Sequence, residues 1–91
     1  MFIVVSYDIV DDKRRNRAAK ILKDYGEKVQ FSVFECILNE VILKEMKKRI
    51  AGVIETKEDS IRIYYLCDAC QKKIVVEGVG RVSEDRDLYV V

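Results

Sequence analysis

One aspartate in this chain, Asp8, stands where a carboxylate can bind a metal ion. It lies near the end of residues 2–9, a stretch rich in β-branched and aromatic residues that is typical of a strand covered on both faces. Carboxylates at the carboxyl ends of central strands often bind ligands in α/β folds. The structural alternative is that Asp8 caps the following helix or accepts a hydrogen bond in the turn.

A second copy of the chain would give Asp8 a partner of the same kind. In a dimer whose sheets face each other across a two-fold axis, the two Asp8 carboxylates could approach one another. They would repel unless a proton or a cation lay between them, and Mg²⁺ suits such a site because it needs only one or two carboxylates. The position of Asp8 is therefore compatible with Mg²⁺ shared between two protomers.

A cluster of cationic side chains follows Asp8 in the sequence. Its members are Lys13, Arg14, Arg15, Arg17, Lys20 and Lys23. Three arginines within four positions favour a phosphate ligand, because a guanidinium group can donate two parallel hydrogen bonds to phosphate. The structural alternative is an ordinary solvated helix face. Contacts of this kind hold a nucleic-acid backbone without distinguishing its sequence.

Other residues suited to chemistry are few. Ser32 can donate a hydrogen bond to phosphate, and Phe34 fits an interface or, as we favour, the core. The sequence has no His, so the usual general base and the commonest zinc ligand are missing. Cys67 and Cys70 have the spacing of a metal or redox pair. A structural zinc site would need a second pair, so we favour thiols that close a turn, with a local disulfide as the alternative in a thermophile, and leave their role open.

The segments around these residues alternate between helical and strand periodicity. Apolar positions at helical spacing predict a helix over residues 12–25, with Asp11 or Asp12 as its cap and Gly26 as its stop. A second helix is predicted to begin at Asn39. The other predicted elements are a strand over residues 28–38 that bends near 31–32, a strand over 61–67, a turn over 68–72 and a short strand over 74–77.

Two architectures fit this order of elements. Taken as it stands, the pattern is β-α-β-α-β-β followed by a tail. If residues 28–38 split near Phe31 and Ser32, the pattern approaches the βαββαβ order of a ferredoxin-like sandwich, an α/β (more strictly α+β) fold. A length of 91 residues indicates one domain, residues 1–91. A net charge of +1 leaves any nucleic-acid binding to local clusters of cations.

The end of the chain is expected to pack on a partner. Residues 81–87 are strongly polar, whereas residues 88–91 are all apolar. An apolar terminus left in water would be unfavourable, and adding it as a strand to a partner's sheet would bury it. Because no apolar run is long enough to cross a bilayer and the features of a signal peptide are missing, we expect a cytoplasmic protein without membrane association.

Several motifs together resemble the CRISPR-associated protein 2 family, the small subunit of the CRISPR spacer-acquisition machinery. The motifs are Ile3–Ile9 (IVVSYDI), Asp12 with Arg15 and Arg17, Gly26 followed by Val29–Glu35 (VQFSVFE), Arg62–Cys67 (RIYYLC) with Cys70, and Gly78. Tyr-Asp followed by Gln-x-Ser-Val-Phe-Glu is a specific combination, whereas Tyr-Asp alone would be weak. The resemblance covers nearly the whole chain.

This resemblance implies a ferredoxin-like homodimer that packs through its sheets and exchanges an extra C-terminal strand. It also implies a Mg²⁺-dependent endonuclease or endoribonuclease of antiviral defence, which cleaves RNA or double-stranded DNA with Mg²⁺ held jointly by the two Asp8 residues. Members also hold DNA as an adaptor for the CRISPR integrase, a role in which nuclease activity is dispensable. Lys28 stands where many relatives have arginine, and lysine cannot form the bidentate fork.

The candidate residues follow from the motifs and the cationic cluster. Asp8 is the candidate metal ligand and catalytic residue, and Tyr7 and Phe34 are candidates for packing or the dimer. The nucleic-acid candidates are Arg14, Arg15, Arg17, Lys28 and Ser32. We expect a metal-dependent phosphodiesterase that also serves as the adaptor, and the alternative is a purely structural, non-catalytic adaptor. A regulatory or toxin-like module outside CRISPR is disfavoured by the resemblance.

Overall fold

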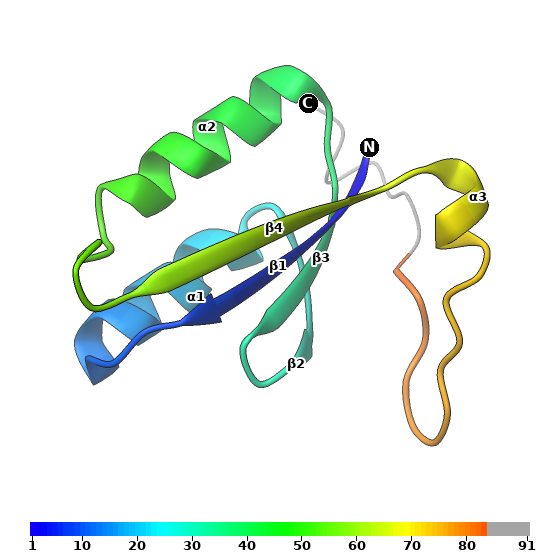
Figure 1. The fold of residues 1–91 in the computed structure, drawn as a ribbon, viewed down its shortest axis with the longest axis horizontal. Coiled ribbons are helices and arrows are strands. Elements are labelled where there is room, and N and C mark those ends of the chain that lie inside the picture. The colour runs from blue at the N-terminus through cyan, green and yellow to red at the C-terminus, as the bar shows by residue number, and fades with distance from the viewer. Residues whose placement is uncertain (84–91) are drawn as a thin grey trace.

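The computed structural model describes residues 1–83, which form one antiparallel sheet and three helices. The elements are β1 (Phe2–Asp8), α1 (Asp12–Lys23), β2 (Gly26–Gln30), β3 (Val33–Ile37), α2 (Glu40–Ala51), β4 (Ser60–Leu66) and the short helix α3 (Asp68–Gln71). The strands lie in the order β2-β3-β1-β4. With α1 and α2 on the same face of the sheet (Figure 1), this is the βαββαβ arrangement of a ferredoxin-like sandwich.

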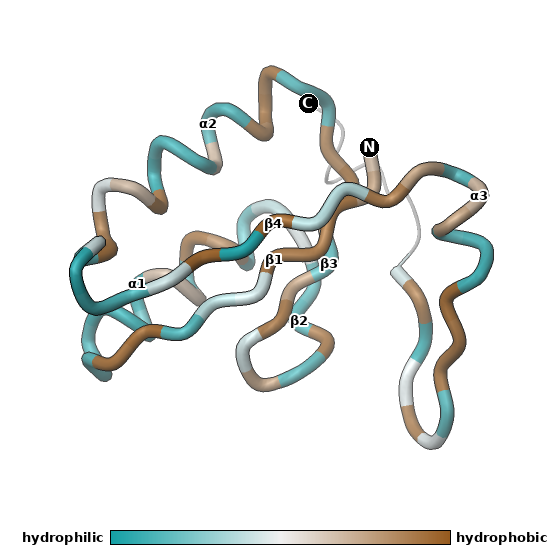
Figure 2. Tube along the Cα trace, viewed as in Figure 1, coloured by the Kyte–Doolittle hydropathy of each residue, from teal (hydrophilic) through white to brown (hydrophobic). Residues whose placement is uncertain are grey.

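The core lies between the sheet and the helices α1 and α2, because successive side chains of β1 point to opposite faces. Ile3 and Val5 are fully buried on the helix-covered face. Leu22 of α1 and Met46 of α2 pack into the same core. Figure 2 shows the alternation of hydrophobic and hydrophilic positions along α2 that gives this helix one face for the core and one for solvent.

Residues 28–38 belong to two strands and not to one bent strand. A turn at Phe31 and Ser32 separates β2 from β3, and a shift in register between Lys28 and Gln30 marks a β-bulge. The Phe31 side chain at the tip is 76% exposed. The ferredoxin-like order is therefore confirmed, and the order β-α-β-α-β-β is wrong because it merged the two strands of this hairpin.

The predicted helix starts are confirmed by their caps. Asp11 accepts the backbone N–H of Arg14 at 2.9 Å, and Asn39 accepts that of Ile42 at 2.9 Å. The predicted stop of the first helix is wrong, since α1 already ends at Lys23. Gly26 instead begins β2, where β3 approaches too closely for a side chain.

Two predictions for residues 68–77 are also wrong. The predicted turn over 68–72 contains a single turn of helix, α3, and the predicted strand over 74–77 has no regular structure. Val75 is 78% exposed, and no strand of the described sheet pairs with it. β-Branched residues favour an extended backbone, but a strand also needs hydrogen bonds from a neighbour.

Residues 72–83 instead run back to the β2–β3 side of the sheet. The Ser83 N–H donates to Glu35 Oε1 at 3.0 Å, and its hydroxyl donates to Glu27 Oε2 at 3.2 Å. Ser83 is only 3% exposed at this contact. The predicted exchanged strand falls mainly on residues 84–91, which lie outside the described residues.

Replacing Gly26 by alanine should destabilise the fold. A Cβ at this position would overlap the Glu35 carbonyl oxygen and Cys36 Sγ and lie 3.0 Å from Cys36 Cα, so β2 and β3 would have to separate. Overpacking of this kind costs about 1–3 kcal/mol, which chemical denaturation of Gly26→Ala measures directly. The control is Gly52→Ala, because an added Cβ there lies 3.4 Å from its nearest neighbour. Equal losses of stability in the two variants would contradict the close approach of β2 to β3.

Candidate nucleic-acid site at the end of strand β1

Asp8 is the last residue of β1 and lies on the face of the sheet opposite α1 and α2. It shares this face with Val4 and Ser6, because side chains alternate along the strand. It pairs in register with Ser60 at the start of β4. The Asp8 side chain is exposed, and within residues 1–83 no hydrogen bond or ion pair engages its carboxylate.

Other aspartates cap α1 and accept the hydrogen bond in the turn, the two structural roles considered for Asp8. Asp11 caps α1 through the Arg14 N–H. In the turn after β1, the Val10 N–H donates to Asp59 Oδ1 at 3.3 Å. Because neither task falls to Asp8, its carboxylate faces solvent at the end of the inner strand β1. There it can bind a ligand from outside the chain.

Arg14 is held in a cluster of ion pairs that sequence analysis missed. Its Nε and Nη2 donate to the two carboxylate oxygens of Asp59 at 2.9 and 3.2 Å, and Nη2 also donates to Glu58 at 2.8 Å. The Asp59 side chain has no exposed surface and also accepts the backbone N–H of Glu55 at 2.9 Å. The hydrogen-bonded guanidinium lowers the pKa of Asp59, and the carboxylates raise the pKa of Arg14.

This cluster ties the start of α1 to the connection between α2 and β4. Asp59 lies 45 residues beyond Arg14, so no local motif could have revealed the pair. The guanidinium fork that we predicted for phosphate is occupied by carboxylates. A nucleic-acid contact from Arg14 stays a prediction, and the ion pairs give this residue a structural role at the turn that follows Asp8.

Arg15 and Arg17 differ in what they touch. Arg15 donates from Nη1 to the Ile9 carbonyl oxygen at 3.1 Å and pairs with the Asp12 carboxylate. Burial raises the pKa of Tyr7, and the charge of Arg15 partly offsets this effect, so Arg15 lies beside the end of β1. Arg17 is exposed on α1, and within residues 1–83 no hydrogen bond or ion pair engages its side chain. Of these two candidates, Arg17 is therefore the one free to bind phosphate.

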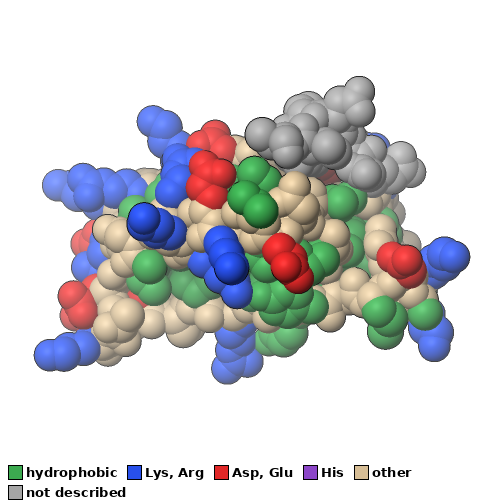
Figure 3. Space-filling view, turned by 90° about the horizontal axis from the view of Figure 1, so that it is seen from above, with side chains coloured by type: hydrophobic (Ala, Val, Ile, Leu, Met, Phe, Trp, Pro, Cys, Tyr) green, Lys and Arg blue, Asp and Glu red, His purple; other side chains and the backbone are tan. Residues whose placement is uncertain are grey.

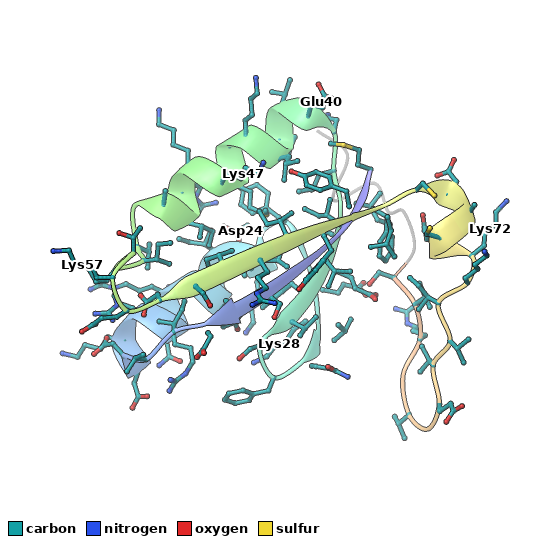
Figure 4. The ribbon with its side chains drawn as sticks, in the orientation of Figure 1. Asp24, Lys28, Glu40, Lys47, Lys57 and Lys72 are labelled. Carbon is teal, nitrogen blue, oxygen red and sulfur yellow. The ribbon has the colours of Figure 1, made fainter. Side chains whose placement is uncertain are left out.

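The β2–β3 turn places Ser32 beside β1 and Lys28 farther away. The Ser32 carbonyl oxygen accepts the Tyr7 N–H at 3.1 Å. Lys28 is exposed on β2 (Figure 4). Its Nζ lies 5.4 Å from the centroid of the Phe31 ring. Lys28 pairs in register with the buried Phe34, so its side chain leaves the sheet on the helix side. One chain therefore does not bring Lys28 to the face that carries Asp8.

Tyr7 and Phe34 pack against each other inside the chain. Their ring centroids are 6.3 Å apart, with 31° between the ring planes. Phe34 is fully buried and Tyr7 is 5% exposed. The core position that we favoured for Phe34 is the observed one, and both rings support the strand that ends at Asp8.

The donor set around Asp8 is a single carboxylate. Within residues 1–83, no three His, Cys, Asp or Glu side chains gather into a group that could hold a metal ion. Asp8 thus offers a single carboxylate, and Mg²⁺ accepts one or two carboxylates while keeping several waters. On the other side of the sheet, the view over α2 in Figure 3 shows Lys and Arg side chains interspersed with Asp and Glu.

Fold and site together define a small ferredoxin-like α+β protein that presents an exposed carboxylate at a strand end and an exposed arginine on the next helix. The family model for CRISPR associated protein Cas2 matches residues 1–74. The chain belongs to this family, as the resemblance of its motifs predicted. Within the described residues, no helix has the length and apolar character needed to span a membrane.

Relatives of known name match over nearly the full length. The CRISPR-associated endoribonuclease Cas2 3 of Chloroflexus aurantiacus is 42% identical over 91 residues, covering 100% of this chain and 98% of that protein. The CRISPR-associated endonuclease Cas2 2 of Thermus thermophilus is 41% identical over 87 residues, covering 96% of this chain and 92% of that protein. These names support nuclease activity in the family.

Solved structures share the fold closely. Cas2 of Streptococcus pyogenes, crystallised at pH 6.5, superposes with a TM-score of 0.77 at 36% identity, covering 86% of this chain and 100% of that chain. A hypothetical protein of Thermus thermophilus gives a TM-score of 0.81 at 41% identity, covering 91% and 96%. Both agree with the ferredoxin-like architecture described above.

The Arg14–Asp59 pair should make stability depend on acid pH. Because Arg14 holds the folded-state pKa of Asp59 below its ordinary value of 3.8, the ionised carboxylate stabilises the fold above that value. The contribution is lost as the pH falls through the lower, folded-state pKa. We therefore expect wild type to be more stable than Asp59→Asn at neutral pH, with the difference in denaturation midpoint closing in strong acid.

The matched control is Asp24→Asn. Asp24 pairs with Arg49 at 3.1 Å, but its side chain is 60% exposed, so this ion pair should contribute little. Its removal should leave the denaturation midpoint nearly unchanged at every pH. A stability difference between wild type and Asp59→Asn that stays constant from neutral to acid pH would show that the Asp59 charge does not act as described.

Proposed function

We propose that this Cas2 protein works as a cytoplasmic homodimer in the spacer-acquisition stage of CRISPR antiviral defence, as an endonuclease and as a DNA-holding adaptor. Asp8 of each protomer would bind a shared Mg²⁺ ion at the nuclease site. The observation that carries the proposal is the exposed Asp8 carboxylate, which no other residue within 1–83 engages. The names of relatives, endoribonuclease and endonuclease, support phosphodiester hydrolysis and leave RNA and double-stranded DNA as alternative substrates.

The sheet face that carries Asp8 supports a dimer. Apolar side chains lie across it at the start of β1, where Phe2 pairs with Ile37 of β3 and Leu66 of β4, and Val4 follows on the same face. Sheets that pack face to face lie roughly 10 Å apart, a gap that side chains reaching in from both sheets can fill. A two-fold axis near the end of β1 would then bring the two Asp8 carboxylates together.

The chain's own residues would divide the work at this site. Bound Mg²⁺ would supply polarisation of a phosphoryl oxygen and activation of a water molecule. Asp8 would bind the ion, and Arg15 would fix the turn after β1 through the Ile9 carbonyl oxygen. Arg17, exposed on α1, would hold a backbone phosphate. With no His in the sequence, the usual general base is missing, and activation of the water would fall to the bound ion.

The adaptor role does not depend on the candidate metal ligand. Holding duplex DNA for the CRISPR integrase requires a rigid dimer and exposed cations, and it does not require Asp8. Arg17 and Lys28 are both exposed and are the candidates for this contact. The tail that follows Ser83 would complete the dimer as a strand on the partner's sheet. The nuclease and the adaptor would then share one scaffold, and the two roles could be separated by mutation.

Changing Asp8 to asparagine should abolish Mg²⁺-dependent cleavage of RNA and double-stranded DNA. Loss of an outer-shell partner of a metal ligand costs about 10–100-fold, and loss of the ligand itself should cost at least as much. The dimer should persist in light scattering, because an exposed carboxylate that repels its mate does not hold the sheets together. The matched control is Glu45→Gln, which neutralises an exposed acid on α2. Undiminished cleavage by Asp8→Asn would refute the metal-site proposal.

Changing Arg17 to alanine should weaken nucleic-acid binding and reduce its salt dependence. Each lost phosphate contact lowers the slope of log K against log salt by about 0.9 for duplex DNA. Titration of labelled DNA at several salt concentrations measures this slope. The control is Lys44→Ala, which removes one exposed positive charge from α2. Equal slopes for Arg17→Ala and the control would leave the phosphate contact without support.

A further inference from the structure

Two exposed cysteines, separated by two residues, mark the junction between β4 and the segment over 72–83. Cys67 directly follows the last residue of β4 and is the N-cap of α3, and Cys70 lies within that helix. Both are free thiols on the surface. Figure 1 shows α3 at the end of β4, with the following segment turning away from it. None of the residues proposed above for the nuclease or the adaptor lies in this junction.

Cys67 contacts the residue with which it would form a disulfide. Cys67 Sγ accepts the backbone N–H of Cys70 at 3.4 Å, across one turn of α3. A disulfide across this spacing is geometrically allowed when the Cα atoms lie about 4.4–6.8 Å apart, as one turn of helix ensures.

We propose that Cys67 and Cys70 are a redox-active dithiol that forms a reversible disulfide by exchange with low-molecular-weight disulfides such as oxidised glutathione. The Cys67 thiolate attacks one sulfur of the external disulfide, whose S–S bond breaks as one glutathione thiolate leaves. Cys70 loses its proton to solvent and attacks Cys67 Sγ, and the second glutathione leaves as a thiolate. Two electrons pass from the protein thiols to the external disulfide, and reduced glutathione reverses the reaction.

The hydrogen bonds around the two sulfur atoms indicate which thiol attacks the external disulfide and which one resolves the mixed disulfide. Hydrogen bonding by Cys70, first from its backbone N–H, lowers the pKa of Cys67, against smaller opposing effects of desolvation and of the neighbouring Asp68. The same contact with Cys67 raises the pKa of Cys70. Cys67 is therefore the attacking thiol and Cys70 the resolving thiol, since the thiolate is the reactive form.

Cys36 supplies an internal control. It is fully buried in β3, and burial raises its pKa to about 12. A thiol of this kind is inert in the folded state, so native labelling should report on Cys67 and Cys70 alone. A zinc site is the weaker alternative, because structural zinc takes four ligands and residues 1–83 contain no group of three.

Oxidation of the two thiols would restrain the backbone that follows β4. The disulfide would link the two ends of the single turn of α3. Residues 72–83 continue from this turn to Ser83, which bonds to Glu27 and Glu35. The loop closed by the bond is very short, so its effect on global stability should be small compared with that of a long-range disulfide. The expected result is slower amide hydrogen exchange over 68–73, with that of β1 unchanged.

The test equilibrates the full-length chain with mixtures of reduced and oxidised glutathione and stops the exchange with acid. The protein is then returned to native conditions without glutathione and alkylated. Intact-mass spectrometry counts the alkyl groups. As oxidised glutathione increases, Cys67 and Cys70 should become unreactive together, with loss of the mass of two hydrogen atoms and no dimeric species on a non-reducing gel. After reduction and denaturation, all three cysteines should react again.

Two variants keep the roles separate. Cys70→Ser should stop at a mixed disulfide between Cys67 and glutathione, and its remaining exposed thiol should react several-fold faster with iodoacetamide at neutral pH than that of Cys67→Ser. Thiols that stay fully reactive at the most oxidising mixture, or a disulfide between chains instead of within one, would overturn the proposal. Equal alkylation rates in the two variants would overturn the assignment of Cys67 as the attacking thiol. Nuclease activity need not be present for any of these readouts.

Discussion

The alternation of side chains along β1 is the constraint on which the candidate site depends. β1 pairs with β3 on one side and β4 on the other, so its register is held from both sides. Ile3 and Val5 are thereby fixed in the core, and Asp8 must leave the sheet on the opposite face. A slip of one residue would bury the carboxylate and expose the core residues, which makes the direction of Asp8 a consequence of hydrophobic packing.

Three aspartates near this strand end have separate tasks. Asp11 caps α1, and Asp59, buried and bonded to Arg14 and two backbone N–H groups, fixes the turn after β1. Because these structural needs are met elsewhere, Asp8 keeps an exposed carboxylate beside a rigid backbone. Rigid support of this kind is what a metal ligand requires if two copies are to meet one ion with little rearrangement.

Local signals predicted the parts of the fold that local chemistry decides. Asp11 and Asn39 precede helical periodicities, and both act as caps. The residues themselves predicted a bend near Phe31 and Ser32 and left a split open, and the family resemblance favoured the split, because this turn lacks the Gly, Asn or Pro that usually marks one. The strand predicted at 74–77 failed because β-branched propensity does not reveal whether a neighbouring strand exists. The same limit applies to the site: the exposed end of β1 followed from its pattern, whereas the partner of Arg14 lies 45 residues away.

The separation of the two Asp8 carboxylates in the assembled protein tests the central claim most directly. A crystal structure of the homodimer grown with Mg²⁺ would measure it. Our account predicts one ion on the two-fold axis with an oxygen from each Asp8 about 2.0–2.1 Å away, or joined to it through a single bound water. A monomer in solution, or a dimer formed through another surface that leaves the two carboxylates on opposite sides of the assembly, would contradict it.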